Sequence, residues 1–145
     1  PTEIGYLTNI ERFNIQNTRV DGTIPTEIGL LSKIEALDLD FLLLSGTLPS
    51  EIGRLSNLVD LFVTSSGVMG EIPSEFGNLS KLEKLTLSWN WMKGTTIPST
   101  LGQLENLVTL DLQVSFVSGT LPKELGNLKH LSELKRVCSL KSIYI

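Results

Sequence analysis

Two aspartates are the side chains of this sequence best placed to do chemistry. Asp38 and Asp40 lie two residues apart, so on a strand they would share a face, with Cα atoms about 6.5–7 Å apart. That distance overlaps the carboxyl separation used in glycoside hydrolysis. Acid–base catalysis also needs surroundings that separate the pKa values of the two carboxyl groups. An open strand without a nearby histidine does not provide such surroundings. Asp111 would lie three strands away, about 14 Å. We therefore expect no catalytic residues and no enzyme activity.

The other reactive side chains are isolated. His130 is the single histidine, with no second ligand at metal-binding spacing. Cys138 is the single cysteine, which excludes an intramolecular disulfide and a cysteine-based metal cluster. We expect a surface histidine, a buried or capping thiol, no metal site and no cofactor.

Composition narrows the partner classes. The net charge is −4 and 19% of residues are charged, so the basic surface that nucleic acid or an anionic membrane requires is missing. No apolar run approaches the roughly 20 residues that span a bilayer. A protein or peptide ligand remains as the expected partner. The oligomeric state stays open.

A period of 24 residues organises the chain. The prolines recur at steps of 24, with one step of 25, and a glycine follows each by four residues. Such a period predicts a solenoid of stacked coils. We expect one domain over residues 1–145, with a degenerate or cap-like last repeat. Its repeats begin at Pro1, Pro25, Pro49, Pro73, Pro98 and Pro122.

The pattern inside each repeat predicts its elements. Leu85 and Leu87 have the period of two that marks a short strand. The Pro-Ser/Thr-Glu segments predict a short helix or 3₁₀ turn on the convex side, because proline suits a first turn and a carboxylate favours that end of the dipole. The glycines mark places where the backbone turns or a neighbouring coil comes close. No coil can bury its own leucines, so the coils must stack.

The combined pattern resembles the plant-type leucine-rich repeat over about residues 1–134. Gly22 to Gly29 reads Gly-Thr-Ile-Pro-Thr-Glu-Ile-Gly, close to that subfamily's consensus. The resemblance implies an α/β solenoid: a right-handed superhelix with a parallel β-sheet on the concave face and short 3₁₀, helical or irregular convex segments. It implies binding, as in ectodomains of receptor-like kinases and receptor-like proteins or in secreted inhibitors of cell-wall hydrolases.

The chain departs from that family in three places. An asparagine ladder usually supports the turns, but Leu42 cannot, so its turn needs another partner such as water. Repeat 4 has one extra residue at Thr95-Thr96, which predicts a local bulge. After Leu134 the pattern fails, and the spacing of Leu131, Leu134, Val137 and Leu140 fits a helical or irregular cap as well as a degenerate coil. The ladder positions are Thr18, Leu42, Ser66, Asn90, Ser115 and Ser139.

Strand positions beside the inward leucines form the candidate binding surface. Phe41, Phe62 and Trp89 are large apolar residues at positions expected to face water, where aromatics often anchor interfaces. Alternatively, Phe41 and Trp89 pack over the strand edge. Trp91 is expected to pack beside Met92. The acids outnumber the bases, which favours a basic partner or simply a solvated face. The candidate contacts are Asp38, Asp40, Phe41, Asp60, Phe62, Thr64, Thr86, Trp89, Asp111 and Gln113.

Two further patterns concern location and an alternative activity. Asn78-Leu79-Ser80 is a glycosylation sequon. Threonine columns like Thr23, Thr47, Thr95 or Thr96, and Thr120 occur on ice-binding solenoids, but β-propensity in a second strand explains this one, because it has one threonine per coil and is interrupted by Glu71. We expect a non-enzymatic protein- or peptide-recognition module, extracellular or at the cell surface, within a receptor-like ectodomain. A secreted hydrolase inhibitor and an intracellular scaffold are the alternatives.

Overall fold

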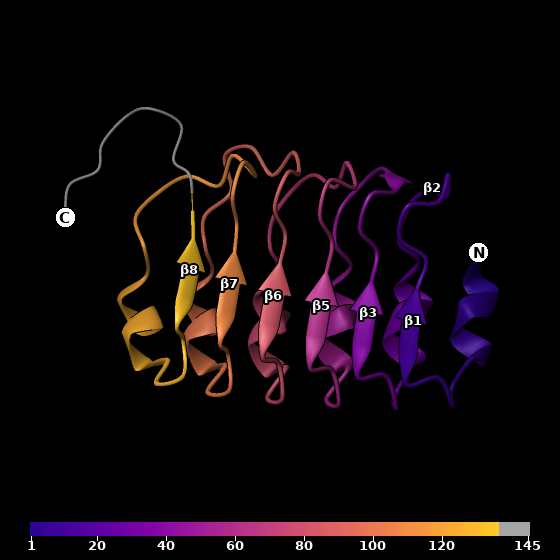
Figure 1. Cartoon of the computed structure of the whole chain (residues 1–145), viewed down its shortest axis with the longest axis horizontal. Coiled ribbons are helices and arrows are strands. Elements are labelled where there is room, and N and C mark those ends of the chain that lie inside the picture. The colour runs from indigo at the N-terminus through magenta and orange to yellow at the C-terminus, as the bar shows by residue number, and fades with distance from the viewer. Residues whose placement is uncertain (137–145) are drawn as a thin grey trace.

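The fold is a stack of coils whose strands form one parallel sheet. It was obtained as a computed structural model, which describes residues 1–136. The strand order is the order of the chain, and each strand pairs with the next (Figure 1). The predicted leucine-rich-repeat solenoid is confirmed. The strands are β1 (Arg12–Asn14), β3 (Ala36–Asp38), β5 (Asp60–Phe62), β6 (Lys84–Thr86), β7 (Thr109–Asp111) and β8 (Glu133–Lys135).

Short 3₁₀ turns form the opposite side of the stack, behind the sheet in Figure 1. Each is five residues long and follows a proline whose carbonyl accepts the first turn's hydrogen bond, as Pro25 does from the N–H of Ile28 at 3.1 Å. The proline is thus the N-terminal cap rather than a residue of the turn. The turns are η1 (Thr2–Tyr6), η2 (Thr26–Leu30), η3 (Ser50–Arg54), η4 (Ser74–Asn78), η5 (Ser99–Gln103) and η6 (Lys123–Asn127).

The core is a continuous aliphatic column between the sheet and the 3₁₀ turns. Leu37, Leu61, Leu85 and Leu110 occupy one register position on successive strands, and all four are fully buried. Leu134 continues this position in β8 but is 40% exposed, because no described coil covers it. Burial of the leucines therefore depends on having a coil on each side.

The two glycine columns serve different purposes. Gly77 lies in η4, and a Cβ there would be 2.6 Å from the carbonyl oxygen of Thr100 in the next coil. Gly70 instead has φ of +78°, a left-handed conformation that favours glycine. One column thus allows neighbouring 3₁₀ turns to approach closely, and the other turns the backbone.

The turns after strands β3, β5 and β6 are supported by side chains of the following coil. Asn90 is buried; its side-chain amide donates to the carbonyl of Val63, and its Oδ1 accepts the N–H groups of Ser66 and Val68 at 3.2 Å. Ser66 in turn supports the coil of Leu42, donating to the carbonyl of Leu39 and accepting the N–H of Leu42. The hydroxyl of Ser66 is therefore the other partner that the turn at Leu42 was expected to need.

A second, discontinuous run of strands follows these turns. Strand β2 (Asp21–Gly22) pairs with β4 (Leu43–Leu44), and single bridges continue the run, among them Met69 to Trp91. In repeat 4 the extra residue is absorbed by a tight turn, in which the N–H of Thr95 donates to the carbonyl of Met92 at 3.3 Å. The predicted bulge is therefore a turn.

The last described segment is a coil and not a helical cap. After η6, strand β8 pairs with β7 in the common register, placing Leu134 beside Leu110. The helical alternative is wrong for residues 131–136. The expectations for Val137, Cys138, Ser139 and Leu140 lie outside the described residues. None of the helical turns within residues 1–136 has the length and hydrophobicity needed to cross a membrane.

Candidate recognition surface

Side chains on the outer face of the sheet form a grid, because strands of equal register repeat every coil. The strand starts align Arg12, Ala36, Asp60, Lys84, Thr109 and Glu133. The strand ends align Asn14, Asp38, Phe62, Thr86, Asp111 and Lys135. Asp40, Thr64 and Gln113 follow two residues beyond the strand ends. The structure thus brings the predicted contacts onto one face and its rim, with Phe41 and Trp89 at the rim.

Carboxylates at the strand ends hold the backbone that follows them. Asp38 and Asp111 each accept, through Oδ1, the N–H two residues later, at 3.1 and 3.0 Å. Phe62 occupies this position in β5 and has no acceptor. There, Oδ1 of Asp40 from the preceding coil accepts the N–H of Thr64 at 2.5 Å. These acids therefore have structural roles as well as facing outward.

The carboxylates of Asp38 and Asp40 are both engaged by the backbone around them. Burial raises the pKa of Asp40, the repulsion of Asp38 adds to the rise, and the hydrogen bond from Thr64 offsets part of it. Both carboxylates are occupied by backbone N–H groups. Asp111 is three strands from Asp38, as expected. His130 is exposed and belongs to the last coil.

The rim residues Phe41 and Trp89 are exposed, by 50% and 58% of their surface. Both have left-handed backbones, with φ of 56° and 59°. Asn17 occupies the equivalent position in the first coil with φ of 56°. Asparagine tolerates this conformation, but a bulky side chain there is strained. The coil imposes the conformation, so Phe41 and Trp89 are held in water at a cost to folding.

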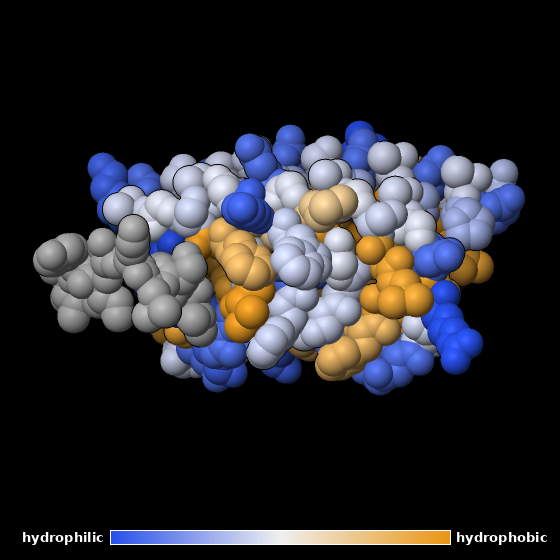
Figure 2. Space-filling view, turned by 90° about the horizontal axis from the view of Figure 1, so that it is seen from above, coloured by the Kyte–Doolittle hydropathy of each residue, from blue (hydrophilic) through white to orange (hydrophobic). Residues whose placement is uncertain are grey.

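Four more apolar side chains continue this rim, and the sequence analysis missed them as a surface. Leu43, Met69, Trp91 and Phe116 are exposed by 42% or more. Figure 2 shows the edge that carries them, where apolar and intermediate side chains run across several coils. Trp91 does have a packing contact, but on the exposed edge and not in the core: its ring stacks on Phe116 with centroids 5.5 Å apart, and the residue is 63% exposed.

A sequence signal for this apolar rim exists. Leu43, Trp91 and Phe116 share a repeat position with Arg19 and Gly67. A buried column would not hold an arginine, so the position had to face outward. The signal was hidden because single apolar residues look like core when each repeat is considered alone.

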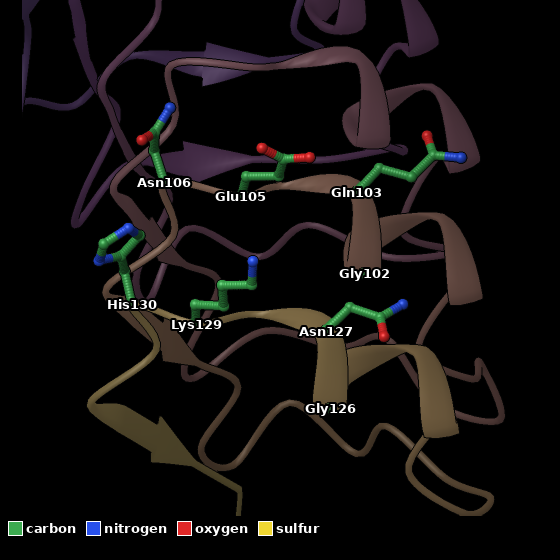
Figure 3. A pocket seen from close by; sticks show the side chains of 8 residues that line it. All are labelled: Gly102, Gln103, Glu105, Asn106, Gly126, Asn127, Lys129 and His130. Carbon is green, nitrogen blue, oxygen red and sulfur yellow. The ribbon is translucent and has the colours of Figure 1, made fainter.

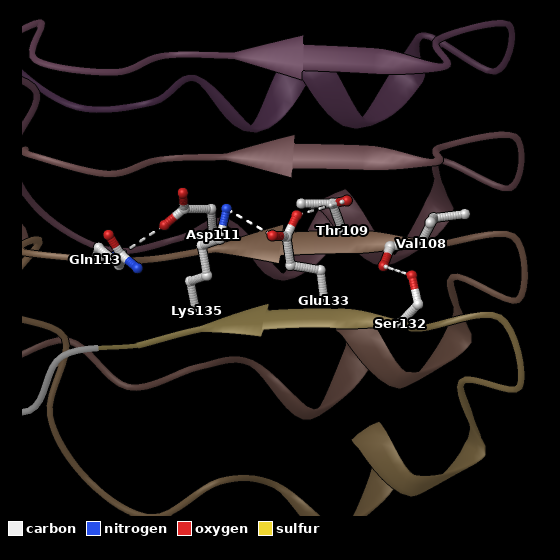
Figure 4. Close-up of polar contacts among 7 residues, drawn as sticks. All are labelled: Val108, Thr109, Asp111, Gln113, Ser132, Glu133 and Lys135. Carbon is white, nitrogen blue, oxygen red and sulfur yellow. Dashed lines mark hydrogen bonds and ion pairs between the residues drawn. The ribbon is translucent and has the colours of Figure 1, made fainter.

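Charge is unevenly balanced along the face. Near the last strands Lys135 pairs with Glu133 at 2.7 Å, and Thr109 contacts the same carboxylate (Figure 4). This ion pair lowers the pKa of Glu133 and raises that of Lys135. At the centre, Lys84 lies 3.7 Å from Asp60, a looser contact. Asp38, Asp40 and Asp111 have no ion-pair partner among residues 1–136, so repeat 2 carries two unpaired carboxylates on this face and repeat 5 carries one.

Away from the sheet, a hollow lies between the last two coils, beside η5 and η6. Gln103, Glu105, Asn106, Lys129 and His130 surround it, with side chains spread around an open rim (Figure 3). Its walls combine both charge signs and no enclosed apolar surface, which is atypical of a small-molecule site. Within residues 1–136, no three His, Cys, Asp or Glu side chains come together as metal ligands.

Asn78 and the threonine column lie away from the sheet face. Asn78 is exposed at the end of η4, on the convex side. Thr23, Thr47, Thr96 and Thr120 are exposed, and Thr95 is buried. Exposed Glu71 interrupts the column between Thr47 and Thr96.

Comparison with solved structures finds this fold in plant receptors. A TDR receptor is 39% identical, with a TM-score of 0.90 over 93% of this chain and 23% of its own. The Arabidopsis receptor kinase HAESA, solved with the peptide hormone IDA and a co-receptor, is 29% identical, with a TM-score of 0.84 over 94% of this chain and 23% of its own. The chain thus spans less than a quarter of either structure.

A plant ice-binding protein is also similar, 30% identical with a TM-score of 0.71 over 78% of this chain and 36% of its own. No family model and no curated protein matches the sequence. The repeat motif, the parallel sheet and the similarity to these receptor ectodomains agree with one another. This chain belongs to the plant-type leucine-rich-repeat family.

Proposed function

We propose that this chain is a non-enzymatic recognition module that binds a peptide or protein across the outer face of its sheet. The observation that carries the proposal is the exposure of Phe41 and Trp89 in strained backbone beside a polar grid. Large exposed aromatics next to polar groups are typical anchors of interfaces. A bulky residue in strained, exposed backbone lowers the stability of the fold. A role in binding a partner would explain why such residues are present.

The receptor comparisons support the same reading. HAESA was solved with a peptide hormone, and its similarity covers 94% of this chain. We propose that this chain belongs to a receptor-like extracellular protein and that Asn78, exposed on the convex side, carries a glycan. A glycan there would leave the sheet face free for the ligand.

The remaining candidate contacts would supply polar recognition. Asp60, Thr86 and Asp111 lie on the successive strands β5, β6 and β7, and Thr64 and Gln113 extend the grid toward the rim. A secreted hydrolase inhibitor would use the same surface. The threonine column disfavours ice binding, because Glu71 breaks the row and ice recognition needs a regular array.

A binding screen with matched variants tests the proposal. The chain is immobilised and screened against a synthetic library of extended peptides, and the bound peptides are titrated against Trp89→Asn and Gln103→Ala. Trp89→Asn should weaken binding at least tenfold, because an interface aromatic contributes about 2 kcal/mol or more. Its thermal midpoint should stay equal or rise, because asparagine relieves the left-handed strain.

Gln103 is the control, since it is exposed in η5 on the far side of the coil. Gln103→Ala should leave peptide affinity unchanged. If Gln103→Ala removed binding while Trp89→Asn did not, the sheet face would not be the recognition surface. A fall of the Trp89→Asn midpoint would show instead that Trp89 is a packing residue.

A further inference from the structure

A small hollow in the sheet face lies over Ala36. Ala36 is the smallest residue among the strand-start positions, where the other strands carry Arg12, Asp60, Lys84, Thr109 and Glu133. Above the small Ala36 methyl group lies a space of about 190 Å³. Strands β1, β3 and β5, side by side in Figure 1, form its floor.

The walls of this hollow have a defined chemistry. Asp38 follows Ala36 on the same strand face, Asp60 is its register partner in β5, and Phe62 is the register partner of Asp38. Neighbouring strands are about 4.8 Å apart and alternate residues about 7 Å. A group above Ala36 therefore has two carboxylates and one aromatic ring within reach. Arg12 and Asn14 close the side toward β1.

The two carboxylates are differently satisfied. Asp38 is held in place, since it accepts the N–H of Asp40 at 3.1 Å and the side-chain amide of Asn14 at 3.0 Å. Oδ1 of Asp60 is buried and accepts no hydrogen bond within residues 1–136; its cation, Lys84, is 3.7 Å away. A charge-assisted hydrogen bond is normally about 2.7–2.9 Å. Asp60 is thus only loosely paired with Lys84, and its side chain keeps 23% of its surface exposed.

We propose that the Ala36 hollow is a subsite for one cationic side chain of the bound peptide, an arginine in particular. A guanidinium has planar donors for two carboxylates and a flat face that stacks on an aromatic ring. Asp38, Asp60 and Phe62 offer both kinds of contact around one space. This inference rests on the proposed recognition function and adds the class of ligand side chain and its position.

Removing the charge of Arg12 should change the affinity in the opposite direction to removing a carboxylate. Arg12 lines the hollow but has no ion pair within 4.0 Å among the described residues. Its charge should repel a ligand cation. Removing that charge in Arg12→Gln should therefore tighten binding, whereas Asp60→Asn should weaken it.

The test uses the whole chain and a defined probe. An acetylated and amidated Ser-Arg-Ser peptide is titrated at millimolar concentration, and the Ala36 methyl and Phe62 ring signals are followed by NMR. The same peptide with citrulline in place of arginine is the matched control, since it has the shape without the charge. The arginine peptide should give saturable shifts at both residues, and the citrulline peptide should give none.

Three variants complete the design. Ala36→Leu fills the hollow and should abolish the Phe62 shifts, with an unchanged thermal midpoint confirming folding. Asp60→Asn should weaken the arginine peptide about two- to fivefold, as loss of a partly exposed ion pair does, and Arg12→Gln should tighten it by a similar factor.

Equal binding of the citrulline peptide, or full binding by Ala36→Leu, would overturn the subsite. The proposed function has a separate readout. If library peptides are lost in Trp89→Asn yet bind normally to Ala36→Leu and Asp60→Asn, the recognition surface stands and the cation subsite is wrong.

Discussion

Asn90 shows how a single side chain can determine a turn in a neighbouring coil. Its amide and carbonyl satisfy backbone groups of Val63, Ser66 and Val68, all in the preceding repeat. Buried backbone groups without partners are costly. Ser66 and Ser115 do the same with one hydroxyl each. The ladder therefore continues from Ser66 to Ser115 with fewer bonds at the serines, and it is interrupted at Leu42, whose side chain forms no hydrogen bond.

Asn90→Ala should destabilise the chain by about 2–4 kcal/mol, because several buried donors and acceptors would lose their hydrogen-bond partners. The measurement is the free energy of unfolding from urea denaturation. Asn106→Ala is the matched control: its amide also bonds a carbonyl of the preceding coil, that of Ser80 at 2.8 Å, but it is exposed. It should cost less than about 1 kcal/mol. Equal losses would mean that the ladder bonds are solvated.

The stacked 3₁₀ turns are the elements that set the distance between coils. Their glycines lie against the backbone of the next turn, and the period of 24 residues gives every coil the same height. The sequence showed two glycine columns without showing which one turns and which one packs. That distinction depends on φ and on the neighbouring coil, and neither is visible in a single repeat.

Gly77→Ala should destabilise the chain by about 1–3 kcal/mol, since a Cβ would meet the carbonyl of Thr100 at 2.6 Å and force the turns apart. Gly126 occupies the same repeat position in η6, where a Cβ would meet nothing within 4 Å. Gly126→Ala should therefore change stability by less than about 0.5 kcal/mol. Thermal unfolding of the two variants measures the difference. Similar effects would show that the column is required for conformation and not for packing.

At the scale of the whole molecule, each coil is stabilised by its immediate neighbours. Within residues 1–136, backbone contacts between elements join successive 3₁₀ turns and successive strands. Phe13 and Ile15 in the first coil are only partly buried, and Leu134 in the last is 40% exposed, whereas Leu61 and Leu85 are inaccessible. Stability in such a stack is a sum over neighbouring pairs.

Amide hydrogen exchange should therefore be slowest in β5 and β6 and faster in β1 and β8 of the 145-residue chain. End coils open locally without disrupting the centre. Exchange measured by mass spectrometry or NMR gives the protection of each strand. Uniform protection from β1 to β8 would show that the chain unfolds as one cooperative unit.

The sequence by itself determined the solenoid. Prolines, glycines and leucines at one period can align only if identical coils stack, and Leu37 to Leu110 then share one buried column. It also identified the outer face, because alternate residues of a strand point to opposite sides. Alternation alone does not explain the exposure of Phe41 and Trp89, because each lies two residues beyond a buried leucine and is turned outward by its left-handed backbone.

Only the tertiary structure decided what depends on residues 24 positions away. It showed that Asp40 supports Thr64 in the next coil, that Trp91 stacks on Phe116, and that the space over Ala36 is walled by Asp38, Asp60 and Phe62. The physical reason is lateral contact. A repeat pattern fixes which side a residue faces, but the size, charge and hydrogen bonds of its neighbours in adjacent coils decide what that residue can bind.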